Sequence, residues 1–231
     1  MTGNLDLAAS GTLALSVCLM GDLYVNCGAN GFLAILAGLL ATLLCGIING
    51  LVVTRLRLAS FIATLATTNI YRGIASVYTD GYSSQGMPPL VRFIGTAKIG
   101  IVPVSVLVML LVYTASWFIL AKTSFGLNMQ AVGGNMNAAK LSGINIDKVR
   151  VAAFVFSGLT AFIAGMILAG RMNTTNPSLA AGIEMNCVAA AVIGGTSMHG
   201  GIGGVWSTMI GAVIMRVISN GMNQLGAILL L

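Results

Sequence analysis

The segment that decides the fold is KTSFGLNMQAVGGNMNAAKLSGINIDKVR, which runs from Lys122 to Arg150. It is polar and basic, and it lies between two apolar runs, Ile99–Ala121 and Val151–Gly170, which contain no Asp, Glu, Lys, Arg or His. About 20 mostly apolar residues let a helix cross the hydrocarbon core of a bilayer, so both runs predict transmembrane helices. The segment between them therefore lies at a membrane face.

The charge of this segment indicates which face it is. Its basic residues outnumber its single acidic residue, Asp147. Cytoplasmic loops of membrane proteins carry an excess of Lys and Arg, so we place residues 122–150 on the cytoplasmic side. A long cytoplasmic segment with a short helix, held between two spans, is typical of a docking site for another protein.

The composition excludes a soluble globular protein. Hydrophobic residues make up 57% of the chain and charged residues only 7%, whereas soluble domains carry about 25% charged residues. The net charge of +6 does not indicate a nucleic-acid partner, because the basic residues stand at segment ends without a basic–aromatic patch. Positive-inside bias and contact with anionic membrane lipid explain them.

We expect no metal and no cofactor. The four cysteines show neither a C-x-x-C motif nor a Cys/His pair, and they lie in or beside apolar runs, where cysteine packs as a small apolar residue. The chain also lacks the G-x-x-x-x-G-K-[ST] order that cradles the phosphates of ATP.

The pattern predicts an all-α, polytopic membrane helix bundle with about seven transmembrane segments. A single transmembrane domain would cover residues 1–231. Residues 79–98 and 173–182, rich in turn formers, predict external loops. The uncharged run Met185–Met215 is too long for one span, and the glycine-rich stretch Gly194–Gly204 divides it. The segments are Leu7–Val25, Gly31–Val53, Leu58–Tyr78, Ile99–Ala121, Val151–Gly170, Met185–Met198 and Gly201–Val217.

Weak internal similarity suggests a transporter. Gly38–Thr42 and Ile48–Gly50 resemble Gly204–Thr208 and Ser219–Gly221, and inverted repeats with glycine-broken helices are typical of transporters. Polar residues inside spans are candidates for a substrate path, although hydrogen bonds between helices are the simpler explanation for any one of them. The scarcity of charge favours a neutral substrate. The candidate path residues are Asn49, Thr64, Thr67, Thr68, Asn69 and Asn186.

Four ordered stretches resemble one known family. Ala131–Asn145, AVGGNMNAAKLSGIN, is similar to the cytoplasmic coupling segment of bacterial ABC importer permeases for ribose, xylose and galactose, A-[IV]-G-G-N-x-x-A-A-x-[LY]-S-G-I-[NP]. GNLDLAASGTLAL from Gly3, RLASFIATLATTNIYRG from Arg57 and AAAVIGGTSMHGGIGG from Ala189 also resemble that family. It belongs to the branched-chain amino-acid and monosaccharide permease superfamily, whose members usually continue further, so we expect a chain truncated at both ends.

The resemblance implies a transporter subunit and not an enzyme. A short helix in residues 131–145 would seat in a groove of a separate ABC ATPase subunit, which would use the ATP. Without the resemblance, an amphipathic segment bound to lipid headgroups would be the simpler interpretation. The coupling residues would be Gly133, Gly134, Asn135, Asn137, Ala138, Ala139, Lys140, Ser142 and Gly143.

The resemblance further implies a multi-pass protein of the bacterial plasma membrane that imports a monosaccharide or similar small neutral solute. Its partners would be the ATPase, a periplasmic or lipoprotein substrate-binding protein, and a second permease chain, identical or different. Two alternatives stay open, a branched-chain amino-acid permease of the same superfamily and an inactive truncated membrane assembly partner. A membrane enzyme is the least favoured reading, since the spans hold no carboxylate pair, nucleophile–His set or metal cluster.

Overall fold

The computed structural model describes residues 1–224, whose regular secondary structure is almost entirely helical. They form two compact units. The larger unit comprises Leu5–Ala115 and Asn145–Ala181, and the smaller unit comprises Met1–Asn4, Ser116–Ile144 and the chain from Gly182 onward. Helix α5 (Val104–Lys122) contributes to both units.

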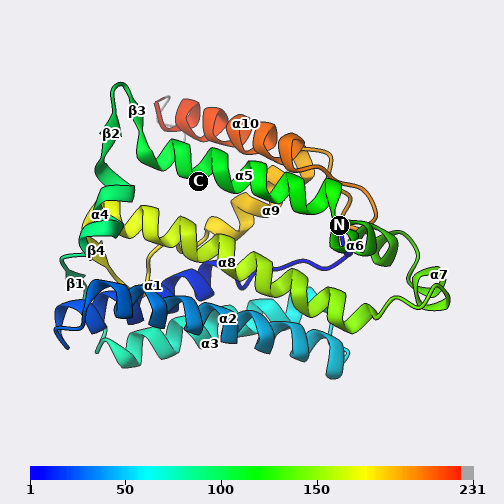
Figure 1. Ribbon diagram of the computed structural model, residues 1–231, viewed down its shortest axis with the longest axis horizontal. Coiled ribbons are helices and arrows are strands. Elements are labelled where there is room, and N and C mark those ends of the chain that lie inside the picture. Colours follow the sequence, from blue (N-terminus) through cyan, green and yellow to red (C-terminus); the bar gives the residue numbers. More distant parts are fainter. Residues whose placement is uncertain (225–231) are drawn as a thin grey trace. The chain divides into compact units, whose positions relative to one another are not determined.

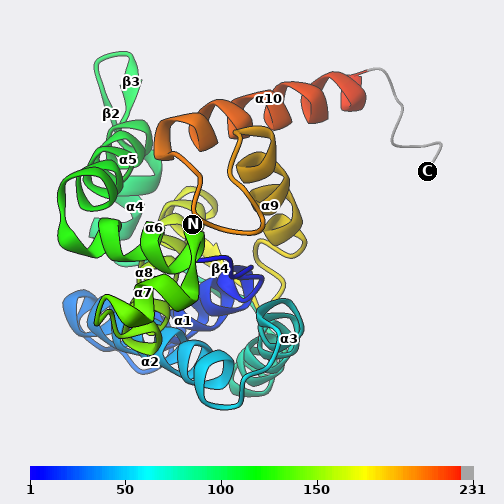
Figure 2. The ribbon, with the colours of Figure 1, turned by 90° about the vertical axis from the view of Figure 1, so that its right-hand side faces the viewer.

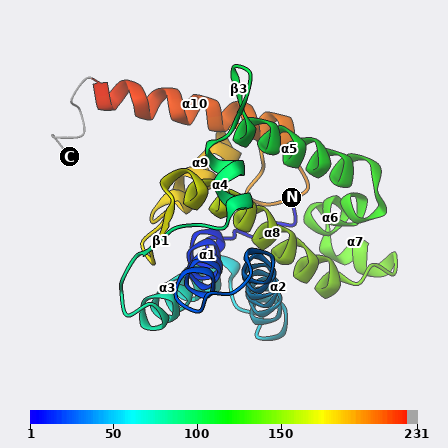
Figure 3. The same ribbon diagram turned by 60° about the vertical axis from the view of Figure 1, so that its left-hand side comes forward.

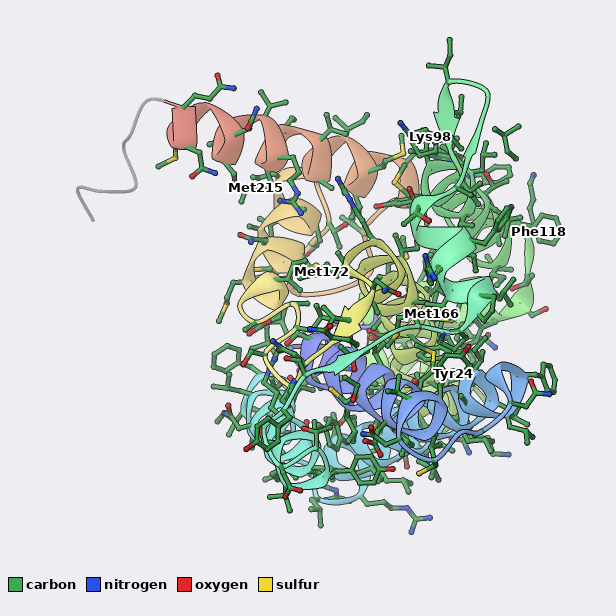
Figure 4. The ribbon with its side chains drawn as sticks, turned by 90° about the vertical axis from the view of Figure 1, so that its left-hand side faces the viewer. Tyr24, Lys98, Phe118, Met166, Met172 and Met215 are labelled. Atoms are coloured by element: carbon green, nitrogen blue, oxygen red, sulfur yellow. The ribbon has the colours of Figure 1, made fainter. Side chains whose placement is uncertain are left out.

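The central helix of the larger unit is α1, which packs against α2, α3 and α8 (Figures 1 and 2). Most residues of α1 are buried, because a helix of small and apolar side chains can be covered by neighbours on several sides. Leu13 and Val17 of α1 meet Phe162 of α8 in the apolar core, and Tyr24 and Met166 pack against that core (Figure 4). The helices are α1 (Ala9–Val25), α2 (Gly31–Arg55), α3 (Ser60–Tyr78), α4 (Pro89–Thr96) and α8 (Ile146–Met172).

Small residues let α2 and α8 approach closely. A Cβ at Gly46 would stand 2.7 Å from Val155 Cα, and a Cβ at Gly50 would stand 2.7 Å from Val151 Cα. Small residues four apart are a common way for membrane helices to bring their backbones together. The register makes the two helices antiparallel, so the basic end of α2 at Arg55 lies beside the start of α8. Arg55 therefore lies at the same end of this helix pair as the predicted cytoplasmic segment 122–150.

The two predicted external loops meet each other. Strand β1 (Ser84–Gln85) pairs antiparallel with β4 (Thr174–Thr175), and Met87 N donates to Asn173 Oδ1 at 3.1 Å. The first loop is more structured than we expected, because Pro89 begins helix α4.

The predicted span Ile99–Ala121 begins too early. Strand β2 (Lys98–Ile99) pairs with β3 (Val102–Pro103), and Val104 N donates to Ala97 O at 2.9 Å. These backbone groups are engaged in the hairpin and cannot belong to a helix, so α5 begins only at Val104.

The smaller unit contains α6 (Ser124–Gly134), α7 (Met136–Leu141), α9 (Ile183–Ile193) and α10 (Val205–Gln224). Helices α9 and α10 lie against each other (Figure 3). Glycines make this packing close, since a Cβ at Gly194 or Gly211 would collide with the backbone of the opposite helix.

Each of the seven predicted segments contains a helix, and the expected all-α, polytopic membrane fold is confirmed. Among the described residues, α2, α5, α8 and α10 are long and apolar enough to span a membrane, and α1 and α9 are shorter apolar helices. The predicted segment to Met198 is too long, because α9 ends at Ile193 after 11 residues. At 1.5 Å per residue such a helix is about 16 Å long and does not cross a hydrocarbon core of about 30 Å. The internal repeat stays a prediction.

Candidate functional site

The helix expected in the cytoplasmic segment is present as α7, and local hydrogen bonds define both of its ends. Asn135 Oδ1 accepts hydrogen bonds from Asn137 N at 3.0 Å and from Ala138 N at 3.1 Å, which satisfies amide groups that the first helical turn leaves unpaired. At the other end Gly143, with φ +79°, donates its N–H to Lys140 O at 3.1 Å. A left-handed glycine is a common way to end a helix.

The segment around α7 is shorter than the predicted loop 122–150. Helix α6 occupies its first part, and α8 begins at Ile146, where Asn145 Oδ1 accepts from Lys148 N at 3.0 Å. The predicted span Val151–Gly170 is therefore the middle of a longer helix. The cap at Asn145, which fixes the start of α8, explains the difference.

Burial distinguishes the two adjacent alanines of α7, Ala138 and Ala139, which were both predicted to be coupling residues. Ala138 is exposed, whereas Ala139 is only 3% exposed and is therefore buried within the protein. Residues one apart in a helix point about 100° away from each other, so a partner that contacts Ala138 does not reach Ala139. The coupling role of these residues stays a prediction.

The other predicted coupling residues surround α7. Gly134, Asn137, Lys140 and Ser142 are exposed, and Gly133 is half-buried at the end of α6. Asn135 is exposed, but its side-chain oxygen already caps α7. Asn135 would therefore act on a docked partner only indirectly, by holding α7 in place.

The sequence analysis missed Leu141, the last residue of α7, whose side chain is 91% exposed. Many of the other exposed large apolar residues lie on the membrane-spanning helices, where lipid covers them. Leu141 instead stands in a polar segment beside Lys140 and Ser142. Its position three residues after Ala138, which places both residues on the same helical face, was the available signal.

Four of the predicted path residues are buried in the larger unit, three of them on α3. Thr64, Thr67 and Thr68 are at most 8% exposed, and the hydroxyls of Thr64 and Thr68 bind an extended segment, Leu5–Leu7. Leu7 N donates to Thr64 Oγ1 at 3.1 Å, and Thr68 Oγ1 donates to Leu7 O at 2.7 Å. Thr67 Oγ1 donates to Thr64 O at 3.1 Å.

The fourth buried residue, Asn49 of α2, is 3% exposed and pairs with Tyr71 of α3. Tyr71 Oη donates to Asn49 Oδ1 at 2.9 Å. The two remaining candidates, Asn69 and Asn186, are exposed. The structure thus brings the three threonines together and places Asn49 beside Tyr71, while Asn69 and Asn186 belong to neither group. Whether these six residues line a path stays a prediction.

Asp6 is a second residue that the sequence analysis did not select. Its Oδ1 accepts from Ala8 N at 2.9 Å, and its carboxyl also takes a hydrogen bond from the Ser157 side chain. Burial raises the pKa of Asp6 above its usual range, and these two hydrogen bonds partly oppose that change. An acidic residue directly before an apolar segment was the available signal.

Arg72 of α3 fastens the loop that follows β4. Its guanidinium donates to Pro177 O at 2.8 Å and to Leu179 O at 3.3 Å. Carbonyl oxygens thus satisfy this charge beside the apolar core. In the described part of the chain, no three His, Cys, Asp or Glu residues gather in a way that could hold a metal ion.

Comparison with known proteins supports a transport role. The family model "branched-chain amino acid transport system / permease component" matches residues 1–230. The ribose import permease protein RbsC of Bacillus subtilis is 39% identical over 228 residues, covering 98% of this chain and 70% of that protein. RbsC of Escherichia coli K12 is 35% identical over 230 residues, covering 98% and 71%. The D-allose transport system permease protein AlsC of Escherichia coli K12 is 37% identical over 227 residues, covering 97% and 69%.

No solved structure matches the chain. The family model and these relatives extend over nearly its whole length, and its apolar helices fit a protein of the cytoplasmic membrane. The family resemblance of the four sequence motifs is therefore confirmed. The chain belongs to the family of branched-chain amino acid transport system permease components, and it is a membrane-spanning transport subunit.

Proposed function

We propose that this chain is the permease subunit of an ABC importer for a monosaccharide or a similarly small neutral solute, and that α7 docks on the ATPase subunit. The relatives named for ribose and D-allose support the class of solute. The alternative, a branched-chain amino acid, has its support in the description of the family model.

The exposed apolar end of α7 is the observation that carries the docking proposal. Leu141 is 91% exposed, and the caps at Asn135 and Gly143 hold the short helix in one conformation. A preorganised helix loses little conformational entropy on binding. An apolar side chain at its tip, with Lys140 beside it, suits a groove in a soluble protein subunit.

The charges of the larger unit support a neutral solute. The guanidinium of Arg72 is engaged by backbone carbonyl oxygens, and the carboxyl of Asp6 by Ser157 and Ala8 N. A zwitterionic amino acid in a low-dielectric path would need charged partners of its own. A sugar needs neutral hydrogen-bonding groups instead, and the exposed amide side chains of Asn69 and Asn186 are of that kind.

The complete importer in this proposal has further parts. A substrate-binding protein delivers the solute from outside, and a second permease chain, identical or different, encloses the path with this one. The ATPase subunits bind and hydrolyse ATP, so the permease itself needs no cofactor. The path within this chain would include Asn49, Thr64, Thr67, Thr68, Asn69 and Asn186.

Reconstitution with the ATPase subunit and the substrate-binding protein of the same importer tests the proposal. Proteoliposomes would be supplied with ATP, and uptake of labelled ribose, allose and leucine would be compared. We expect uptake of a sugar and none of leucine, while uptake of leucine alone would favour the amino-acid alternative.

Docking is tested with Ala138→Trp, which places a large side chain on the exposed face of α7. Ala121→Trp is the matched control, because Ala121 is also exposed but stands at the membrane end of α5, where Trp is well tolerated. We expect the ATPase to co-purify with the wild type and the control but not with Ala138→Trp. Equal recovery with all three proteins would refute docking through α7, and no recovery with any would favour an inactive assembly partner.

A further inference from the structure

Three segments of the smaller unit meet at glycines that are far apart in the sequence. They are residues 1–4, the end of α6 at Gly133–Gly134, and the turn 197–204 between α9 and α10. Gly201 N donates to Met1 O at 2.8 Å. Figure 2 shows the N-terminus beside α6 and the chain that leads into α10. We call Gly3, Gly133, Gly200 and Gly201 the glycine junction.

The glycine junction has no room for side chains. A Cβ at Gly133 would collide with Met1 O and would stand 2.5 Å from Gly201 N. A Cβ at Gly200 would stand 2.8 Å from both Gly133 O and Gly3 N. Gly200 and Gly201 also have φ values of +96° and +77°, which residues other than glycine rarely adopt. The three segments are therefore in direct backbone contact.

The neighbouring Gly134 differs sharply. A Cβ there would meet nothing within 4 Å, although Gly134 immediately precedes the capping residue of α7. The glycine requirement thus belongs to the face of α6 that touches the turn and not to the whole Gly133–Gly134 pair. Gly221 of α10 also has open space around it and is not among the predicted coupling residues, so it provides a control within the smaller unit.

The turn is closed by its own hydrogen bonds. Ser197 N donates to Ile202 O at 3.0 Å, and Gly200 N donates to Ser197 O at 3.2 Å. A displacement of Gly200 would therefore carry the whole turn, and with it the ends of α9 and α10. Backbone atoms in contact cannot yield by changing rotamer, as side chains do, so a movement of α6 would be passed on with little loss.

We propose that the glycine junction transmits the movement of α6 and α7 to the α9–α10 helix pair during the transport cycle. This inference rests on the proposed docking of the ATPase at α7. Gly133 and Gly200 act as positioning residues, since they act through the backbone of the turn and need not contact the solute. Energetic coupling between two distant sites requires a contiguous structural element whose conformation both sites influence.

The test compares Gly133→Ala with Gly221→Ala in the reconstituted importer. For each protein the recovery of the ATPase subunit, the rate of ATP hydrolysis and the amount of solute moved per ATP would be measured. We expect Gly133→Ala to retain the ATPase and its hydrolysis while the solute moved per ATP falls about tenfold, because overpacking displaces the turn. Gly221→Ala, whose added Cβ has open space around it, should match the wild type in all three quantities.

The outcomes separate this inference from the proposed function. If the wild type fails to bind the ATPase, the proposed docking is wrong. If the wild type binds and transports, and Gly133→Ala moves as much solute per ATP as Gly221→Ala, the junction does not transmit and the inference fails. Loss of ATPase binding by Gly133→Ala alone would also overturn it, because the residue would then serve docking.

A measurement on the wild type keeps the proposal testable if Gly133→Ala does not fold. Amide hydrogen exchange would be followed in residues 195–204 with the ATPase bound in the ATP and the ADP states. We expect exchange in this turn to differ between the two nucleotide states. Identical exchange in both states would overturn the proposal.

Discussion

The substitution Leu141→Ser provides the sharpest quantitative test of docking at α7. The side chain of Leu141 is 91% exposed, so nearly all of its apolar surface is available to a partner. Complete burial of a leucine side chain contributes about 1.5–3 kcal/mol. Removing it should therefore weaken the affinity for the ATPase by about 2 kcal/mol, which corresponds to about 30-fold in Kd.

The affinity would be measured by fluorescence anisotropy of a labelled ATPase subunit titrated with the permease in nanodiscs. Leu127→Ser is the matched control, because Leu127 is an exposed leucine on α6 at 64% exposure. Its Kd should stay within about twofold of the wild type, as expected for a surface substitution outside the contact. Both variants should unfold at the wild-type temperature, since neither side chain is buried.

Two results would refute this reasoning. A Leu141→Ser protein with the wild-type Kd would show that the exposed leucine does not enter the interface. An equal loss with Leu127→Ser would show that general surface hydrophobicity, and not the tip of α7, governs association.

Three further predictions concern the larger unit. Gly46→Ala, which forces a Cβ against the backbone of α8, should destabilise the protein by about 1–3 kcal/mol in a thermal-unfolding assay, whereas Gly73→Ala, with open space around it, should not. Arg72→Met should release the loop 176–181 and increase its amide hydrogen exchange, and unchanged exchange would show that the guanidinium does not hold it. Tyr71→Phe should lower stability by about 0.6 kcal/mol by removing an interhelical hydrogen bond, and a variant as stable as the wild type would contradict this.

The short helix α7 could be predicted because its determinants are local. The short helix expected within residues 131–145 is observed as Met136–Leu141, and the residues that start and stop it lie within two positions of its ends. The boundaries of the spans were less predictable. Hydrophobicity does not distinguish the hairpin at 98–103 from the start of α5, because the pairing of its backbone groups, and not its composition, decides the difference.

The candidate site was predictable only in part, and for a related reason. The threonines of α3 were selected as polar residues within a span, but hydropathy does not reveal that Thr64 and Thr68 bind the backbone of Leu7. Ala138 and Ala139 look alike in the sequence, whereas the packing of α7 exposes one and buries the other. Leu141 shares a helical face with Ala138, but the sequence does not show whether packing covers that face.

The polytopic membrane class of the protein and its family follow from the sequence alone, because they depend on composition and on motifs along a single stretch of chain. Which residues touch follows only from the folded structure. Gly133 and Gly200 are separated by all of α7, α8 and α9, yet the backbone at one leaves no space for a side chain at the other. Such contacts depend on how the helices pack, and packing is a property of the folded chain that no local pattern carries.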